Sequence, residues 1–146
     1  MRIAILAVIL IFSTQFIPVT ALTDNEKNNV EAVGTSLLMK SEFISYGLVE
    51  IDYGNTMKIW FISSDDDQST VASSLGMVVG VYLGACKMFP EISDLKLMVG
   101  TKNNVAGELY AERAWADGVR MNPDGSYNSD DVAVLGLKVL GTYKDR

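Results

Sequence analysis

The chain contains no histidine, and this absence excludes more chemistry than any other feature of the sequence. Without an imidazole there is no Ser-His or Cys-His nucleophile, no histidine general base and no histidine-ligated zinc or haem iron. Carboxylates, Lys, Tyr and Ser remain, but they show no recognisable pair at a spacing typical of an active site. The composition therefore favours a function without catalysis.

Cysteine is almost as scarce, because Cys86 is the only one. An internal disulfide is therefore excluded, and packing of apolar side chains must hold the fold together. We expect Cys86 to be a small buried apolar residue rather than a reactive thiol. An intermolecular disulfide is the alternative for this side chain.

Basic residues are few and scattered. The chain has 12 Lys and Arg against 18 Asp and Glu, which gives a formal net charge of −6. This balance repels nucleic acid and anionic membrane surfaces, and no cluster of Lys or Arg offsets it locally. Neither nucleic acid nor an anionic lipid surface is an expected partner.

The sequence begins Met1-Arg2 and continues with an apolar run from Ile3 to Phe12, and Val-Thr-Ala stands further along at residues 19–21. This pattern is typical of a secretory signal peptide. The alternative is an uncleaved membrane anchor, but polar residues and Pro18 interrupt the run well short of the ~20 apolar residues that a spanning helix needs. We predict a signal peptide over residues 1–21, a single α+β domain over residues 22–146, no membrane span after cleavage and a secreted or extracytoplasmic location.

Capping residues and apolar periodicity predict three helices. Thr23 and Glu26 form a capping box that starts a helix ending near residue 40. Residues 70–88 are apolar on nearly all sides, which predicts a long buried helix with Asp67 or Ser69 as its cap. Ser129 is the expected cap of a third helix over residues 132–143, although its β-branched residues leave a strand as the alternative.

Two pairs of strands lie between these helices. Residues 43–53 and 57–62 are typical of one hairpin, and residues 93–101 and 105–115 of another. Matching the apolar faces gives an expected register: Tyr53–Met57, Ile51–Ile59, Val49–Phe61 and Asp52–Lys58 in the first hairpin, and Leu95–Ala111, Leu97–Leu109 and Val99–Gly107 in the second. The element order predicts an α+β fold in which an antiparallel sheet of two hairpins carries the long helix across one face.

A row of small residues at spacing four runs along the long helix: Ala72, Gly76, Gly80 and Gly84. In lipid such a row is typical of a dimerising span. Serines and Lys87 in the same segment favour a soluble helix instead. We expect the row to let a sheet or a neighbouring helix approach this backbone closely.

Residues 121–141 combine a turn rich in Asn, Asp and Gly with a helical pattern, and they resemble one half of a dockerin, whose calcium loop leads into a helix. Aligned on Gly125, the resemblance implies Ca²⁺ ligands at Asn122, Asp124, Asn128 and Asp131. The first ligand position falls on Arg120, whose charge opposes a bound cation. The alternative is an Asx-type turn and helix cap built from the same residues. No cofactor other than Ca²⁺ is expected.

Residues of the predicted strands that alternate away from the core form a face with many aromatic side chains. Its candidate partner-binding residues are Tyr46, Trp60, Met98 and Tyr110. Leu48 and Ile62 lie among them, and the charged border consists of Glu50, Lys58, Lys96 and Glu108. Aromatic side chains inside a charged rim are typical of a protein interface. The alternative is that the first or third helix covers this face and makes it a second core layer. This alternative is favoured because one face of the sheet cannot hold all three helices.

These observations predict a secreted, non-catalytic domain that binds a protein partner or a second copy of itself as a dimer. One rival function is an extracytoplasmic hydrolase that uses paired carboxylates, such as a glycoside hydrolase. Another is a dockerin-like calcium module. A cleft with two carboxyls of raised pKa would favour the hydrolase, and a flat aromatic surface would favour the binding module.

Overall fold

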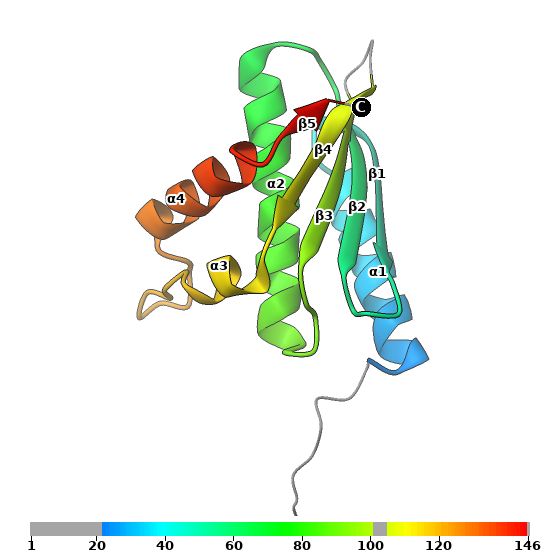
Figure 1. Cartoon of the computed structure of the whole chain (residues 1–146), viewed down its shortest axis with the longest axis vertical. Coiled ribbons are helices and arrows are strands. Elements are labelled where there is room, and N and C mark those ends of the chain that lie inside the picture. The colour runs from blue at the N-terminus through cyan, green and yellow to red at the C-terminus, as the bar shows by residue number, and fades with distance from the viewer. Residues whose placement is uncertain (1–21, 101–104, 146) are drawn as a thin grey trace, which may run out of the picture.

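The computed structural model describes residues 22–100 and 105–145 (Figure 1). Its elements in chain order are α1 (Asp24–Met39), β1 (Ile44–Ile51), β2 (Met57–Ser63), α2 (Gln68–Met88), β3 (Leu95–Gly100), β4 (Val105–Ala111), α3 (Arg113–Asp117), α4 (Ser129–Leu140) and β5 (Lys144–Asp145). The fold is α+β with the predicted order of helices and hairpins, to which α3 and β5 are added. The predicted signal peptide over residues 1–21 lies outside the described residues.

The five strands form one sheet in the order β1-β2-β3-β4-β5. Each hairpin is antiparallel, as predicted, and β5 pairs antiparallel with β4. The two middle strands, β2 and β3, run parallel, so the whole sheet is mixed rather than antiparallel. The parallel pair exists because α2 carries the chain back along the sheet before β3 begins, as a crossover helix does.

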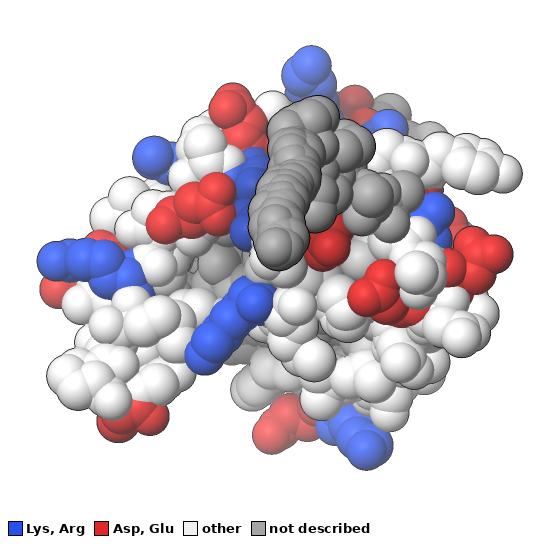
Figure 2. Space-filling model, turned by 90° about the horizontal axis from the view of Figure 1, so that it is seen from below, with Lys and Arg blue, Asp and Glu red and all other residues white. Residues whose placement is uncertain are grey.

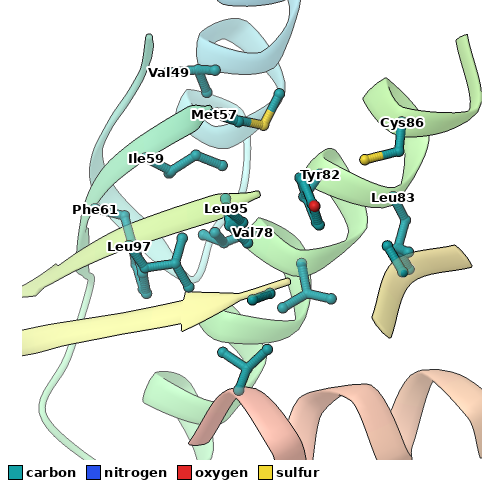
Figure 3. Close-up of a cluster of buried hydrophobic side chains, with 14 of the residues drawn as sticks. Val49, Met57, Ile59, Phe61, Val78, Tyr82, Leu83, Cys86, Leu95 and Leu97 are labelled. Carbon is teal, nitrogen blue, oxygen red and sulfur yellow. The ribbon is translucent and has the colours of Figure 1, made fainter. Parts of the chain in front are cut away.

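The core lies between one face of this sheet and α2 (Figure 3). Alternate strand residues, among them Ile59, Phe61 and Leu97, point into it and are fully buried. The predicted apolar face of α2 is buried too, and it includes Tyr82 and Cys86. Cys86 is a free thiol, and its burial raises its pKa to about 11, so it is protonated at neutral pH. Cys86 therefore packs as a small apolar residue, as predicted.

The second hairpin has the predicted register. Leu97 lies opposite Leu109, Leu95 opposite Ala111, and Val99 opposite Gly107. The alternation of apolar residues decides which side chains share a face, and in this hairpin the predicted alignment is also the observed one.

The register predicted for the first hairpin is wrong by two residues. The observed pairs are Ile51–Met57, Glu50–Lys58, Val49–Ile59 and Gly47–Phe61. The cause is Asp52, whose Oδ1 accepts hydrogen bonds from the N–H groups of Gly54 and Thr56 at 2.9 and 3.0 Å. This Asx turn ends β1 early and leaves Tyr53 98% exposed in a five-residue loop. Because the shift is even, the residues that stay paired, Tyr46–Ile51 and Met57–Ile62, keep their predicted faces.

The helix starts follow the capping signals. The capping box of α1 is present, with the Glu26 N–H donating to Thr23 Oγ1 and the Thr23 N–H donating to Glu26 Oε1. Asp67 caps α2. The last segment is a helix, but its cap is Asn128 rather than Ser129, because Asn128 Oδ1 accepts the N–H of Asp131 at 3.0 Å.

The small-residue row of α2 does not pack as predicted. A Cβ atom at Gly76, Gly80 or Gly84 would meet no heavy atom within 4 Å in the described part of the chain. The row faces outward because α2 packs on the sheet through its larger apolar residues. By length and composition alone α2 is a candidate membrane span, a test that core helices of soluble proteins also pass.

The β1 edge of the sheet is covered by α1, and a short strand extends the sheet beyond β4. Side chains of α1 accept the outward N–H groups of β1, including the N–H of Val49, which donates to Thr35 Oγ1 at 2.9 Å. At the other edge β5 pairs with β4, and Thr142 Oγ1 accepts the N–H of Tyr110 at 2.9 Å. Among the described strands, the broadest surface left for a partner is the face of the sheet that points away from α2.

Candidate functional site

The face of the sheet opposite the core is called here the outer sheet face, and the register arranges its side chains in rows. The first row is Glu50–Lys58–Lys96–Tyr110, the second is Leu48–Trp60–Met98–Glu108, and the third begins Tyr46–Ile62. All four predicted partner-binding residues, Tyr46, Trp60, Met98 and Tyr110, therefore lie on one face. The structure gathers Tyr46, Trp60 and Met98 over β1, β2 and β3, with Tyr110 one row away on β4.

This face is open to solvent in the described part of the chain. Tyr46 and Trp60 are each 38% exposed and Tyr110 is 39% exposed, whereas Met98 is half-buried. In Figure 1 both α1 and α2 lie behind the sheet, so neither covers the face turned to the viewer. The alternative that the first or third helix covers this face is therefore wrong for the described residues. The helices find room because α1 lies along the edge of β1 and α4 flanks α2.

Edge-to-face contacts hold the aromatic rings in place. The Tyr46 and Trp60 ring centroids lie 5.4 Å apart with the planes at 70°. At the β4 end, Tyr110 meets Trp115 of α3 at 5.8 Å and 70°. Lys138 of α4 lies over the Trp115 ring, 5.7 Å from its centroid. Such pairs fix ring orientation, which lowers the entropy lost when a partner binds.

Trp115 is the member of this aromatic surface that sequence reasoning missed. The sequence predicts a strand as far as residue 115, whereas β4 ends at Ala111 and Trp115 lies in α3. The available signal was weak, because Glu112 precedes the helix without a side-chain capping bond. Half-buried Trp115 packs against the core and contacts the Tyr110 ring, so it connects the β4 end of the outer sheet face to the core.

Charged residues border the apolar centre of the outer sheet face. Glu50 and Lys58 are direct cross-strand partners, and Lys58 is in turn the cross-strand partner of Lys96. The Lys58 ammonium also lies 3.9 Å from Asp52 Oδ2. The end of the molecule shown in Figure 2 carries acidic and basic side chains interspersed, without a continuous patch of one sign.

The residues of the calcium prediction lie together in the loop before α4 and in the first turn of that helix, and their side chains are hydrogen-bonded within this segment. Asp131 accepts from the Arg120 guanidinium at 2.8 and 3.1 Å and from its N–H at 2.9 Å. Asp124 Oδ1 accepts the N–H and hydroxyl of Ser126 at 2.9 and 2.6 Å. These bonds hold the pKa of both carboxyls below the ordinary value.

The other two predicted ligands are also engaged. Asn128 caps α4, and the Asn122 amide donates to Ser126 Oγ at 3.0 Å. Gly125, at φ +88°, adopts the left-handed conformation that the turn requires. Within residues 22–100 and 105–145, no group of three His, Cys, Asp or Glu side chains is placed to hold a metal ion. Calcium binding stays a prediction, and the local geometry is that of an Asx-type turn and helix cap.

The carboxylate enzyme needs a general acid with a raised pKa. The described carboxyls with a resolved shift are Asp67, Asp124 and Asp131, and hydrogen bonds lower the pKa of all three. This is the direction opposite to the one that a general acid needs.

An apolar cavity of about 420 Å³ lies between α1 and α2. Val33, Leu37, Gly80 and Met88 are among its lining residues, and Asn29 is the one polar residue in that lining. The outer sheet face differs from this cavity because it combines exposed aromatic side chains with a charged border.

Comparison with known protein families, with characterised proteins and with solved structures finds no match to this chain. Its function must therefore be argued from the geometry of the chain itself.

Proposed function

We propose that this chain is a non-catalytic protein-interaction module that docks its partner on the outer sheet face. The observation that carries the proposal is the exposed aromatic cluster around Trp60, bordered by Glu50, Lys58 and Lys96. Interfaces commonly have such an anatomy, with an aromatic centre inside a polar rim.

The covered β1 edge and the shortness of the edge strand β5 support a face-to-face contact rather than strand addition. A partner that adds a strand needs free N–H and C=O groups along an edge. Here Thr35 accepts the outward Val49 N–H at the β1 edge, Thr142 accepts the Tyr110 N–H on β4, and the edge strand β5 is only two residues long. A partner therefore gains more from the outer sheet face, where apolar side chains are still in contact with water.

The rigidity of the site also supports binding. Trp60 stands on the second strand of a five-stranded sheet, between β1 and β3, and its ring is held by Tyr46. Little conformational freedom is lost when a partner covers a side chain that is already fixed. Truncation of such an aromatic anchor commonly costs ~2 kcal/mol or more of binding free energy.

Site-directed photo-crosslinking in the cell that produces the protein tests the proposal. A benzophenone amino acid replaces Met98 on the outer sheet face, and in a matched control it replaces Tyr53 in the exposed turn beyond β1. The proposal predicts discrete protein adducts from position 98 and none of the same mass from position 53. Absence of adducts from position 98, or the same adducts from both positions, would overturn it.

A further inference from the structure

We propose that one partner of the outer sheet face is a second copy of the chain, packed around a two-fold axis that runs parallel to the strands between β1 and β2. This inference rests on the proposed function and adds the identity and orientation of a partner. The contact is isologous, so it closes as a dimer.

The charges of the first row carry the inference. Glu50 of β1 and Lys58 of β2 lie side by side in that row. A two-fold axis between the two strands places Glu50 of each copy opposite Lys58 of the other. Two equivalent Glu50–Lys58 ion pairs then form by symmetry, one on each side of the axis. Lys58 also keeps Asp52 as a neighbour within its own copy. Opposite charges at facing positions fix the register of a contact.

Two neighbouring axes along the strands place like charges together. An axis along β2 itself sets Lys58 opposite Lys58 of the second copy. An axis between β2 and β3 sets Lys58 opposite Lys96, because these two residues are cross-strand partners in the first row. Facing like charges cost several kcal/mol. The axis between β1 and β2 avoids both clashes.

The apolar rows agree with the same axis. In the second row, Trp60 of one copy faces Leu48 of the other, and in the third row Tyr46 faces Ile62. Each aromatic ring thus meets an aliphatic side chain in both halves of the dimer. Packed sheets lie ~10 Å apart with their strands within about 30° of each other, which keeps short rows in register.

Two charge-reversal variants test this geometry by sedimentation velocity. In Glu50→Lys the facing positions 50 and 58 both carry Lys, and in Lys58→Glu both carry Glu. Each variant alone is therefore expected to dimerise at least about tenfold more weakly than the unchanged protein. Mixed in equal amounts, the two are expected to form a heterodimer, because Lys then faces Glu on both sides of the axis. Effects confined to one chain cannot produce this recovery on mixing.

Lys96→Glu is the matched control, because Lys96 faces neither Glu50 nor Lys58 across this axis. It is expected to remain dimeric and to give no recovery when mixed with Glu50→Lys. Melting curves establish that each variant is folded. If a reversal prevents folding, the neutral variants Glu50→Gln and Lys58→Gln replace it, and each is expected to weaken the dimer.

Three results would overturn the inference: an unchanged protein that is monomeric, a Lys58→Glu chain that still dimerises fully, or no recovery on mixing. None of these bears on adducts from position 98 to a different protein. The proposed function and this dimer therefore fail by different measurements.

Discussion

Glu31 Oε2 accepts a hydrogen bond of 2.8 Å from the backbone N–H of Ile51, joining α1 to the outer edge of β1. The contact repeats along the strand, since Thr35 accepts from Val49 and Met39 Sδ from Gly47. Four helical residues rise ~6 Å and two strand residues ~6.6 Å. Side-chain acceptors four residues apart on α1 therefore match backbone N–H groups two residues apart on β1. These contacts close the β1 edge to strand addition.

Removing one of these acceptors should destabilise the fold. Thr35→Val keeps the shape of the side chain but leaves the Val49 N–H without its partner, with an expected loss of ~1–3 kcal/mol in the free energy of unfolding. Urea titration measures the change. Ser36→Ala, at the neighbouring exposed position of α1, should change stability by much less. Equal stability of the two variants would show that the edge contacts contribute nothing.

The outward-facing glycine row leads to a substitution that is expected to stabilise the fold. Gly80→Ala should raise the free energy of unfolding by ~0.5–1 kcal/mol, because the new methyl group meets open space and alanine favours the helix. Gly107→Ala is the contrasting variant, since its Cβ would overlap the Lys144 backbone oxygen and should push β5 away from β4. Thermal melting compares the two. Destabilisation by Gly80→Ala would mean that another segment packs on the row.

Alternation along the strands was enough to predict the outer sheet face. Trp60 lies between Ile59 and Phe61, which are buried, so the pleat sends its indole to the opposite face. The register error at Asp52 did not alter this assignment, because a shift of two preserves the faces. That the face is exposed could not be predicted, since it depends on where the helices pack.

The sequence did not predict the elements that depend on contacts between residues far apart in the chain. Helix α3 begins at Arg113, whose N–H donates a hydrogen bond to Asp94 Oδ1, 19 residues earlier in the chain. The two-residue strand β5 depends on the missing side chain of Gly107. The edge contacts of Glu31 and Thr35 depend on the position of α1 beside β1. None of these leaves a periodic signal in the local sequence.

Calcium should not stabilise the unchanged protein, because the Arg120 guanidinium already binds the Asp131 carboxylate and the Asp124 carboxylate accepts a hydrogen bond from Ser126. We expect no rise in melting temperature in millimolar Ca²⁺. Arg120→Asp frees Asp131 and adds an oxygen ligand at the first position, so it should gain weak calcium-dependent stabilisation. A clear rise for the unchanged protein would support the dockerin-like function instead.

The Arg120–Asp131 contact predicts part of the acid sensitivity. Its hydrogen bonds lower the pKa of Asp131 in the folded state below the unfolded value near 3.9. The stabilisation is therefore complete above that value and is lost as the pH falls through the folded pKa. Asp131→Asn should be less stable at pH 7 and should lose less further stability below pH 4. Parallel losses in both proteins, measured by thermal melting across pH 2–7, would contradict this.

The most direct test of the central claim, that the outer sheet face is a binding surface, is the effect of Trp60→Ala on self-association and on folding measured together. Sedimentation velocity should show a monomer where the unchanged protein is dimeric, and thermal unfolding should show little change in monomer stability. Loss of folded structure, with Trp60 fluorescence in a Trp115→Phe background already blue-shifted and protected from quencher in the monomer, would make Trp60 a core residue and contradict the account.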